Sequence, residues 1–250
     1  MKREELNKIQ PLNNLVLIKI DKEFNDQIVF KESGVKLYFD PSYSKERHST
    51  VTGEVVKLPF KLIFNDHKNI NSMQWLTSIE LEIGDKVWCN WTAFRKAFDE
   101  KKGLRFVCEE SLYILINYGD VVVSMRGDDI ICLNGYCLIE PVLQLDLPEN
   151  LRSEWLNKLV ANDSIVPDTL NKPSKLYGKV FKLGKPNEDY MEDAYSDGMD
   201  EDIQEGDIIL FAKAADLLLE YELHKSLLGD RAFYKIQRRL MKLVYRGEKD

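Results

Sequence analysis

The amino-acid sequence predicts a mainly β protein made of two tandem domains of one type, residues 1–134 and 135–250. Runs of β-branched and aromatic residues are broken by Gly, Asp and Asn, as expected of strands joined by turns. A set of short phrases occurs twice in the same order, and an internal repeat indicates a repeated architecture. A chain of 250 residues also exceeds the usual size of one domain, whereas two domains of about 120 residues can each bury a core.

The first copy has four strand-like phrases, which cover residues 11–19, 52–58, 83–88 and 121–133. Residues 15–20 are almost continuously apolar, which is typical of a strand covered on both sides. An acidic pair, Asp128-Asp129, precedes the last Ile-rich run. Residues 111–117 and 121–125 also have strand patterns, and the Tyr-Gly-Asp between them predicts a hairpin.

The second copy keeps this order with looser matches. Its phrases cover residues 136–141, 177–184, 205–211 and 233–245. The opening lacks a Pro-Leu pair, Lys179 stands in place of Glu54, and Arg238-Arg239 replaces the acidic pair. The repeat is therefore predicted from the order of the phrases rather than from any single one of them.

Two segments have a helical composition. Residues 148–161 place apolar side chains, among them Trp155 and Leu156, at amphipathic spacing after a Pro and an acidic start, which predicts a short helix. Residues 212–228 have a similar composition. Because both segments interrupt the repeated strand order, we expect them to be insertions.

The ordered phrases resemble those of the GroES family of co-chaperonins. The closest matches are the Pro-Leu opening at residues 11–19 and the Gly-Glu-Val-Val strand at residues 53–56. A Gly-Asp turn before an apolar strand and an acidic pair before a closing strand complete the set. The resemblance implies two tandem GroES-like β-barrels with loop and short helical insertions, similar in arrangement to the tandem co-chaperonins of plastids.

The resemblance also implies a function without catalysis, cofactor or metal. A co-chaperonin caps a GroEL-like chaperonin ring in its nucleotide-bound state, encloses a client polypeptide and assists ATP-dependent protein folding. Members of the family act as homo-oligomers, so we expect one here. The alternative is that the repeated fold serves as a structural or assembly protein, for example in a phage or another ring, without chaperonin binding.

In this family a loop between the first two strands carries a short aliphatic run that docks on the chaperonin, and ordering its flexible flanks keeps the affinity moderate. The corresponding residues of the first copy are Gly34, Val35 and Leu37, and those of the second are Ile165, Val166 and Pro167. Lys36 interrupts the run in the first copy. The other interpretation is that Val35 and Leu37 alternate on one face of an ordinary half-buried strand.

Charge and hydropathy argue against two classes of partner. With 42 acidic and 35 basic side chains the net charge is −7, whereas nucleic-acid binding depends on a basic face. No run approaches the roughly 20 apolar residues that cross a bilayer, and the first residues lack the apolar run of a secretory signal. We therefore expect a cytoplasmic protein that binds neither nucleic acid nor membrane.

Candidate metal sites are weak. Residues 187–207 hold ten acidic residues and no Lys or Arg, but charge runs of this kind are usually solvated loops rather than cation sites. The four cysteines are Cys89, Cys108, Cys132 and Cys137. Because they lie mostly in apolar runs, we expect buried thiols rather than metal ligands or disulfides.

Catalysis and base stacking find little support. Aromatic and basic residues interleave between residues 75 and 106, as in a nucleic-acid platform. We expect instead that Trp88 fills the first barrel and that residues 91–98 cover its mouth or an inter-domain contact. The three histidines stand alone, without a nucleophile elbow or Gly-rich phosphate loop. The dinucleotide fingerprint and zinc ligands of the barrel-containing alcohol dehydrogenases are missing too.

Overall fold

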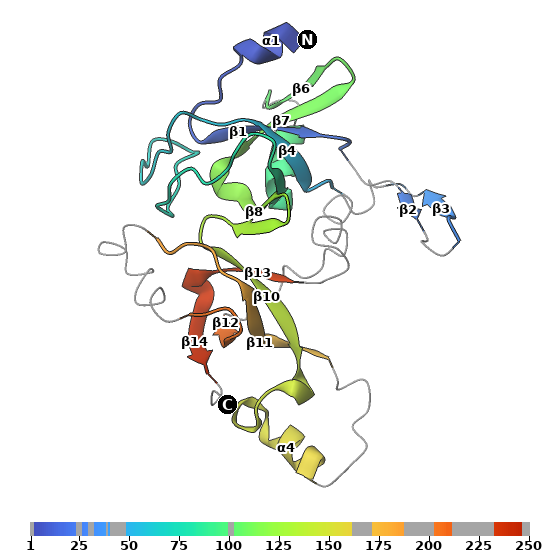
Figure 1. Cartoon of the computed structure of the whole chain (residues 1–250), viewed down its shortest axis with the longest axis vertical. Coiled ribbons are helices and arrows are strands. Elements are labelled where there is room, and N and C mark those ends of the chain that lie inside the picture. Colours follow the sequence, from blue (N-terminus) through green and yellow to red (C-terminus); the bar gives the residue numbers. More distant parts are fainter. Residues whose placement is uncertain are drawn as a thin grey trace. The chain divides into compact units, whose positions relative to one another are not determined.

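The computed structural model describes residues 3–23, 27–29, 33–38, 40, 49–99, 103–161, 172–187, 203–211 and 233–246. Strands outweigh helices, 43% against 18%, so the predicted mainly β class is confirmed. The chain divides into two compact units, one containing Met1–Asn134 and the other beginning at Gly135. Each unit is built around its own antiparallel sheet (Figure 1).

The first unit has a seven-stranded sheet in the order β6-β7-β1-β4-β5-β8-β9. Its strands are β1 (Leu15–Ile20), β4 (Thr52–Lys57), β5 (Lys86–Cys89), β6 (Arg105–Cys108), β7 (Ser111–Asn117), β8 (Val121–Arg126) and β9 (Asp129–Cys132). Consecutive residues Val16, Leu17 and Ile18 of β1 are all buried. Since neighbouring side chains of a strand point to opposite faces, β1 is covered on both sides, as its sequence predicts.

Among the described residues of the first unit, the helices α1 (Arg3–Lys8) and α3 (Trp91–Phe98) pack against the sheet, and neither was predicted. α1 buries Leu6 against Leu17 and Cys108. α3 buries Ala93, Phe94 and Ala97. This i, i+1, i+4 spacing is typical of an amphipathic helix, but the surrounding aromatic and basic residues obscured it. Trp88 on β5 is buried, as expected.

The second unit has a five-stranded sheet in the order β13-β10-β11-β12-β14. Its elements are β10 (Tyr136–Leu143), η4 (Gln144–Asp146), η5 (Glu149–Leu151), α4 (Glu154–Ala161), β11 (Pro173–Lys182), β12 (Ile208–Phe211), β13 (Tyr234–Gln237), η8 (Arg238–Leu240) and β14 (Met241–Tyr245). α4 lies in the segment whose sequence predicts a helix. The other predicted helix, at residues 212–228, lies outside the described residues.

The two units repeat one five-strand topology. The order β7-β1-β4-β5-β8 in the first corresponds to β13-β10-β11-β12-β14 in the second. The register also recurs, because Gly53 lies opposite Val87 and Gly178 lies opposite Ile209. The register shifts of the first unit, in the β1–β4 and β5–β8 pairings, recur in the β10–β11 and β12–β14 pairings of the second. The β10–β11 pairing has one further shift, between Pro141 and Leu143.

A glycine is required at the same place in both repeats. A Cβ on Gly53 would lie 2.7 Å from the carbonyl oxygen of Lys19 on the adjacent strand. A Cβ on Gly178 would lie 2.9 Å from the carbonyl oxygen of Glu140 and would also contact Ile139. The recurring Gly of the sequence phrases therefore permits close approach of two backbones.

The hairpin predicted over residues 111–125 is wrong. β7 pairs with β1 and β6, whereas β8 pairs with β5 and β9. Between them η3 (Tyr118–Asp120) turns a corner, held by a 2.7 Å hydrogen bond from the Tyr118 N–H to the Asn14 carbonyl. A three-residue 3₁₀ turn redirects the chain instead of folding it back as a two-residue hairpin turn does.

This corner also corrects the predicted alignment of the closing phrases. β7-η3-β8 corresponds to β13-η8-β14, and the N–H of Arg238 donates to the Gly135 carbonyl at 2.9 Å as its counterpart in η3 does. The acidic pair Asp128-Asp129 lies at the β8–β9 turn, after the last repeated strand of the first unit. The arginines of η8 therefore correspond to Tyr118 and Gly119, not to that pair.

Candidate functional site

A short hairpin stands in the loop between β1 and β4. β2 (Gln27–Val29) and β3 (Lys36–Tyr38) pair antiparallel as a separate two-stranded sheet (Figure 1). Gly34 has a φ of 67°, a left-handed conformation that glycine adopts without strain. The N–H of Val35 donates to the Ser33 hydroxyl at 3.4 Å. A two-stranded hairpin is only marginally stable by itself, so contacts beyond its own strands decide its stability.

The hairpin exposes large apolar side chains. The exposed fractions of Val35, Leu37 and Tyr38 are 56%, 53% and 66%. All three residues of β3 are exposed, so the half-buried strand considered from the sequence is not found. Tyr38 was not among the predicted contact residues, because it does not belong to the alternation that places Val35 and Leu37 on one face of a strand. Several exposed apolar side chains in one place mark a protein-interaction surface.

The base of this loop is closed by two contacts. The N–H of Thr50 donates to the Glu23 carbonyl at 3.0 Å. The carboxylate of Glu23 accepts a 2.8 Å hydrogen bond from Arg105 on β6. Ser49 and Thr50 are buried. The residues on the two sides of the loop base, Glu23 on one side and Ser49 and Thr50 on the other, form the stem from which the hairpin extends.

The equivalent loop of the second unit joins β10 to β11. The N–H of Gln144 donates to the Lys172 carbonyl at 3.1 Å and closes its base. The loop carries α4, which buries Leu156 and leaves 55% of Trp155 exposed. The predicted contact residues Ile165, Val166 and Pro167 lie outside the described residues.

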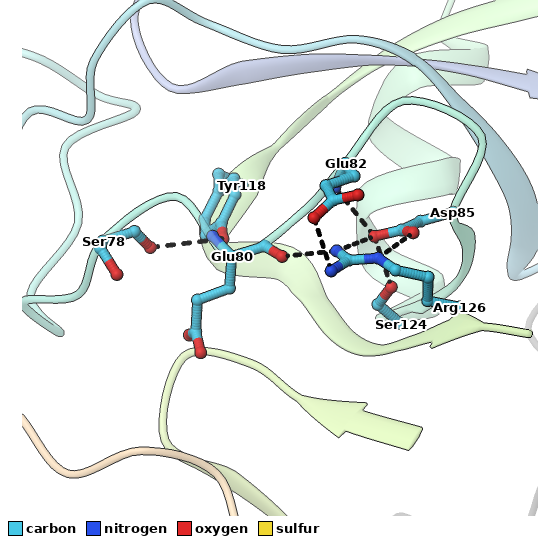
Figure 2. A network of polar contacts seen from close by, with 7 residues as sticks. All are labelled: Ser78, Glu80, Glu82, Asp85, Tyr118, Ser124 and Arg126. Carbon is cyan, nitrogen blue, oxygen red and sulfur yellow. Dashed lines mark hydrogen bonds and ion pairs between the residues drawn. The ribbon is translucent and has the colours of Figure 1, made fainter. Parts of the chain in front are cut away.

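A second candidate is a polar network at the Gly-Asp turn before β5, drawn in Figure 2. Asp85 is buried, and its carboxylate accepts hydrogen bonds from Ser124 Oγ at 2.9 Å and from Arg126 at 2.9 and 3.0 Å. The N–H of Glu82 donates to the same carboxylate at 2.8 Å. Arg126 also forms a 2.7 Å ion pair with the Glu82 carboxylate.

Tyr118 extends this network from the η3 corner. Its hydroxyl accepts a 2.8 Å hydrogen bond from the Glu80 N–H, and the Glu80 carbonyl accepts from Arg126 at 3.0 Å. Burial raises the pKa of Tyr118 to about 12. Burial also acts to raise the pKa of Asp85, but the hydrogen bonds from Arg126, Glu82 and Ser124 outweigh it and lower that pKa below 3.8.

This network stabilises the turn rather than performing chemistry. A general base needs a lone pair within reach of a substrate proton, whereas both Asp85 oxygens already accept hydrogen bonds inside the protein. An ionised Asp85 is the state that these bonds require, because its carboxylate accepts all of them, and burial keeps Tyr118 neutral by raising its pKa. The sequence phrase Gly-Asp predicted the turn, but nothing near it pointed to Ser124 or Arg126.

Among the described residues, no three His, Cys, Asp or Glu side chains are grouped as metal ligands would be, and no helix there is long and apolar enough to span a bilayer. The four cysteines are buried, as predicted, and burial raises the pKa of Cys137 to about 11. Residues 188–202 of the acidic segment lie outside the described residues.

Comparisons of the chain with protein-family models and with curated proteins find no match. The residues, the repeated topology and the exposed hairpin are therefore the observations that bear on function. Of the two candidate sites, the hairpin is the one that presents three large exposed apolar side chains, whereas the central Asp85 of the network is buried and already hydrogen-bonded.

Proposed function

We propose that this protein is a GroES-like co-chaperonin that caps a GroEL-like chaperonin ring and docks on it through the β2–β3 hairpin. The observation that carries the proposal is the exposure of Val35, Leu37 and Tyr38 on a hairpin between the first two repeated strands. This is the place where the docking loop of the resembled family lies. The five-strand topology, which occurs twice with the same register, supports a tandem form of that fold.

The chemistry of the hairpin suits reversible docking. Burying a large apolar side chain contributes about 1.5–3 kcal/mol, and three such side chains act together here. Loss of translational freedom and ordering of the loop oppose this gain. The net affinity is moderate, as a lid that leaves the ring in each ATP cycle requires. When the hairpin docks, the methylene groups of Lys36 lie along the apolar docking groove and its ammonium group stays in water.

In this proposal the protein contributes no catalytic group. It acts as a homo-oligomer, and the client polypeptide folds inside the closed cage. The second unit supplies a further docking loop, in which Ile165, Val166 and Pro167 are the contact residues. The alternative function, a structural or assembly protein, does not involve docking of the hairpin on a chaperonin ring.

The first test measures binding of the purified chain to a chaperonin ring of the same source, with and without ATP. Wild type is compared with Val35→Asp/Leu37→Asp and with Ile165→Asp/Val166→Asp. We expect nucleotide-dependent binding that the first double variant weakens at least tenfold, because a carboxylate buried in an apolar groove loses its hydration. Ile70→Asp is the matched control, since Ile70 is 98% exposed and lies in the same unit outside the hairpin.

Two outcomes would change the proposal. Absence of binding under every nucleotide condition would favour the structural or assembly function. Binding that tolerates Val35→Asp/Leu37→Asp but is lost in the Ile165/Val166 variant would assign docking to the second unit alone.

A further inference from the structure

We infer that the ion pair between Glu23 and Arg105 is a positioning device for the docking hairpin. The inference rests on the function proposed above, because it concerns how the hairpin is presented to the chaperonin. Neither residue belongs to the hairpin, and neither was singled out for this role from the sequence. The stem has two limbs, the outgoing residues 21–23 and the returning residues 49–51, and they are held in different ways.

The two limbs differ in their attachment to the first unit. The returning limb is fixed, since Ser49, Thr50 and Val51 are buried and the Val51 carbonyl accepts a 2.8 Å hydrogen bond from the Cys89 N–H on β5. The outgoing limb, residues 21–23, is exposed or half-buried. Its described contacts at Glu23 are the backbone bond to Thr50 at 3.0 Å and the ion pair to Arg105 at 2.8 Å.

Arg105 is a firm anchor for this limb. It lies on β6 opposite Ile114 of β7 in a regular antiparallel ladder. Its guanidinium carbon also lies 6.0 Å from the ring centroid of Phe98 at the end of α3, within the range of a cation–π contact. The ion pair therefore connects the outgoing limb to both the sheet and the helix of the first unit.

Restricting one limb of a long loop reduces the conformations that the hairpin samples before it docks. Preorganisation of this kind improves binding by lowering the ordering cost rather than by adding contacts. The side chains of Arg105 and Glu23 are 34% and 26% exposed, so salt screens their attraction. In the second unit the stem residue Gln144 is neutral, so that loop has no equivalent ion pair at this residue.

A charge-swap experiment tests this role. The full-length variants are Glu23→Arg, Arg105→Glu and the double variant Glu23→Arg/Arg105→Glu, and the readout is the association rate with the chaperonin ring in ATP at low and high salt. We expect each single variant to associate about three- to tenfold more slowly at low salt, because two like charges then face each other. The double variant restores the rate, and high salt removes the differences from wild type.

A matched control is the pair Lys182–Glu205 of the second unit, whose ion pair is 3.0 Å long and also partly exposed. Glu205→Arg should leave the association rate unchanged. Thermal unfolding of every variant separates positioning from folding. A merely structural pair would lower the melting temperature and the rate together, without dependence of the rate on salt.

The outcomes distinguish this inference from the proposed function. Single variants that associate like wild type, or a double variant that stays slow, would overturn the positioning role while wild-type docking still stands. Val35→Asp/Leu37→Asp provides the reference for lost docking in the same assay. A wild-type chain that does not bind the ring would overturn both proposals.

Discussion

The two units repeat their backbone connections closely but differ in the side chains that reinforce them. In the first unit the Gly84 N–H donates to Val55 at 2.8 Å, and in the second the Gly206 N–H donates to Val180 at 2.7 Å. Both glycines have positive φ, 93° and 98°. The backbone of the Gly-Asp turn is thus the same in both units.

The carboxylates that follow these glycines are held very differently. Asp85 is buried and accepts hydrogen bonds from Ser124 and Arg126. Asp207 also accepts from a backbone N–H, that of Gln204, at 2.8 Å, but the Nε of Arg246 is 3.5 Å from it. The comparison teaches that the backbone carries the topology, whereas the side-chain network adds stability in one unit.

The largest expected loss of stability comes from adding a Cβ at Gly53 or Gly178, where in both units the backbones of two strands lie too close for a side chain. Gly53→Ala and Gly178→Ala should each lower the free energy of unfolding by about 3 kcal/mol, the upper end for overpacking, because the obstacle includes a backbone oxygen. Denaturant unfolding measures this. Gly127→Ala is the control, since its Cβ would meet nothing within 4 Å and only the positive φ costs about 1 kcal/mol. Equal losses in all three variants would contradict the shared close approach.

The next largest effect on stability distinguishes the two Gly-Asp turns, at Asp85 and at Asp207. Asp85→Asn should cost about 2 kcal/mol because charge-assisted hydrogen bonds to Arg126 are weakened, whereas Asp207→Asn should cost less than about 1 kcal/mol. The pKa of Asp85 is lowered from 3.8 in the folded state. Its contribution is therefore complete above that pH and is lost as pH falls through the lower folded value.

Unfolding free energies of wild type and Asp85→Asn at several acidic pH values check this sign. The difference between the two proteins should shrink as the pH falls below 3.8. A difference that grows there, or equal costs for the two aspartates, would show that the network is no stronger than its counterpart.

The smallest effect on stability concerns the two 3₁₀ corners, η3 at Tyr118 and η8 at Arg238. Tyr118→Phe should cost about 1 kcal/mol by removing the hydrogen bond from the Glu80 N–H. The pKa of Tyr118 is raised from 10.0 to about 12, so its contribution is present below pH 10.0 and is lost as pH rises through the folded value. Its counterpart Arg238 instead donates to the Gly184 carbonyl at 2.8 Å. A pH series of unfolding for wild type and Tyr118→Phe tests this, and parallel curves would contradict it.

Sequence patterns predicted the parts of the fold that depend on local order. The β class, the burial of β1, the buried cysteines and the helix at α4 all follow from composition and periodicity. Val35 and Leu37 were predicted as docking residues from their place in the repeat, and that role stays a prediction. Tyr38 and Glu23 were not singled out, because the exposure of Tyr38 and the partner of Glu23, Arg105, become visible only in the folded chain.

The failures have a common physical cause. The predicted hairpin between β7 and β8 assumed that neighbouring strands in sequence pair in space, but each of these strands found its partners elsewhere in the sheet. Likewise, Arg126 and Asp85 are far apart in sequence, and only the folded sheet brings them within 3.0 Å.

The sequence by itself determined that this chain repeats a β architecture, because alternation, turn residues and the required glycines are local properties of the chain. Only the tertiary structure decided which strands pair, which charges meet and which apolar side chains stay exposed. Those outcomes depend on long-range contacts, in which burial and hydrogen bonding of distant segments outweigh local preference.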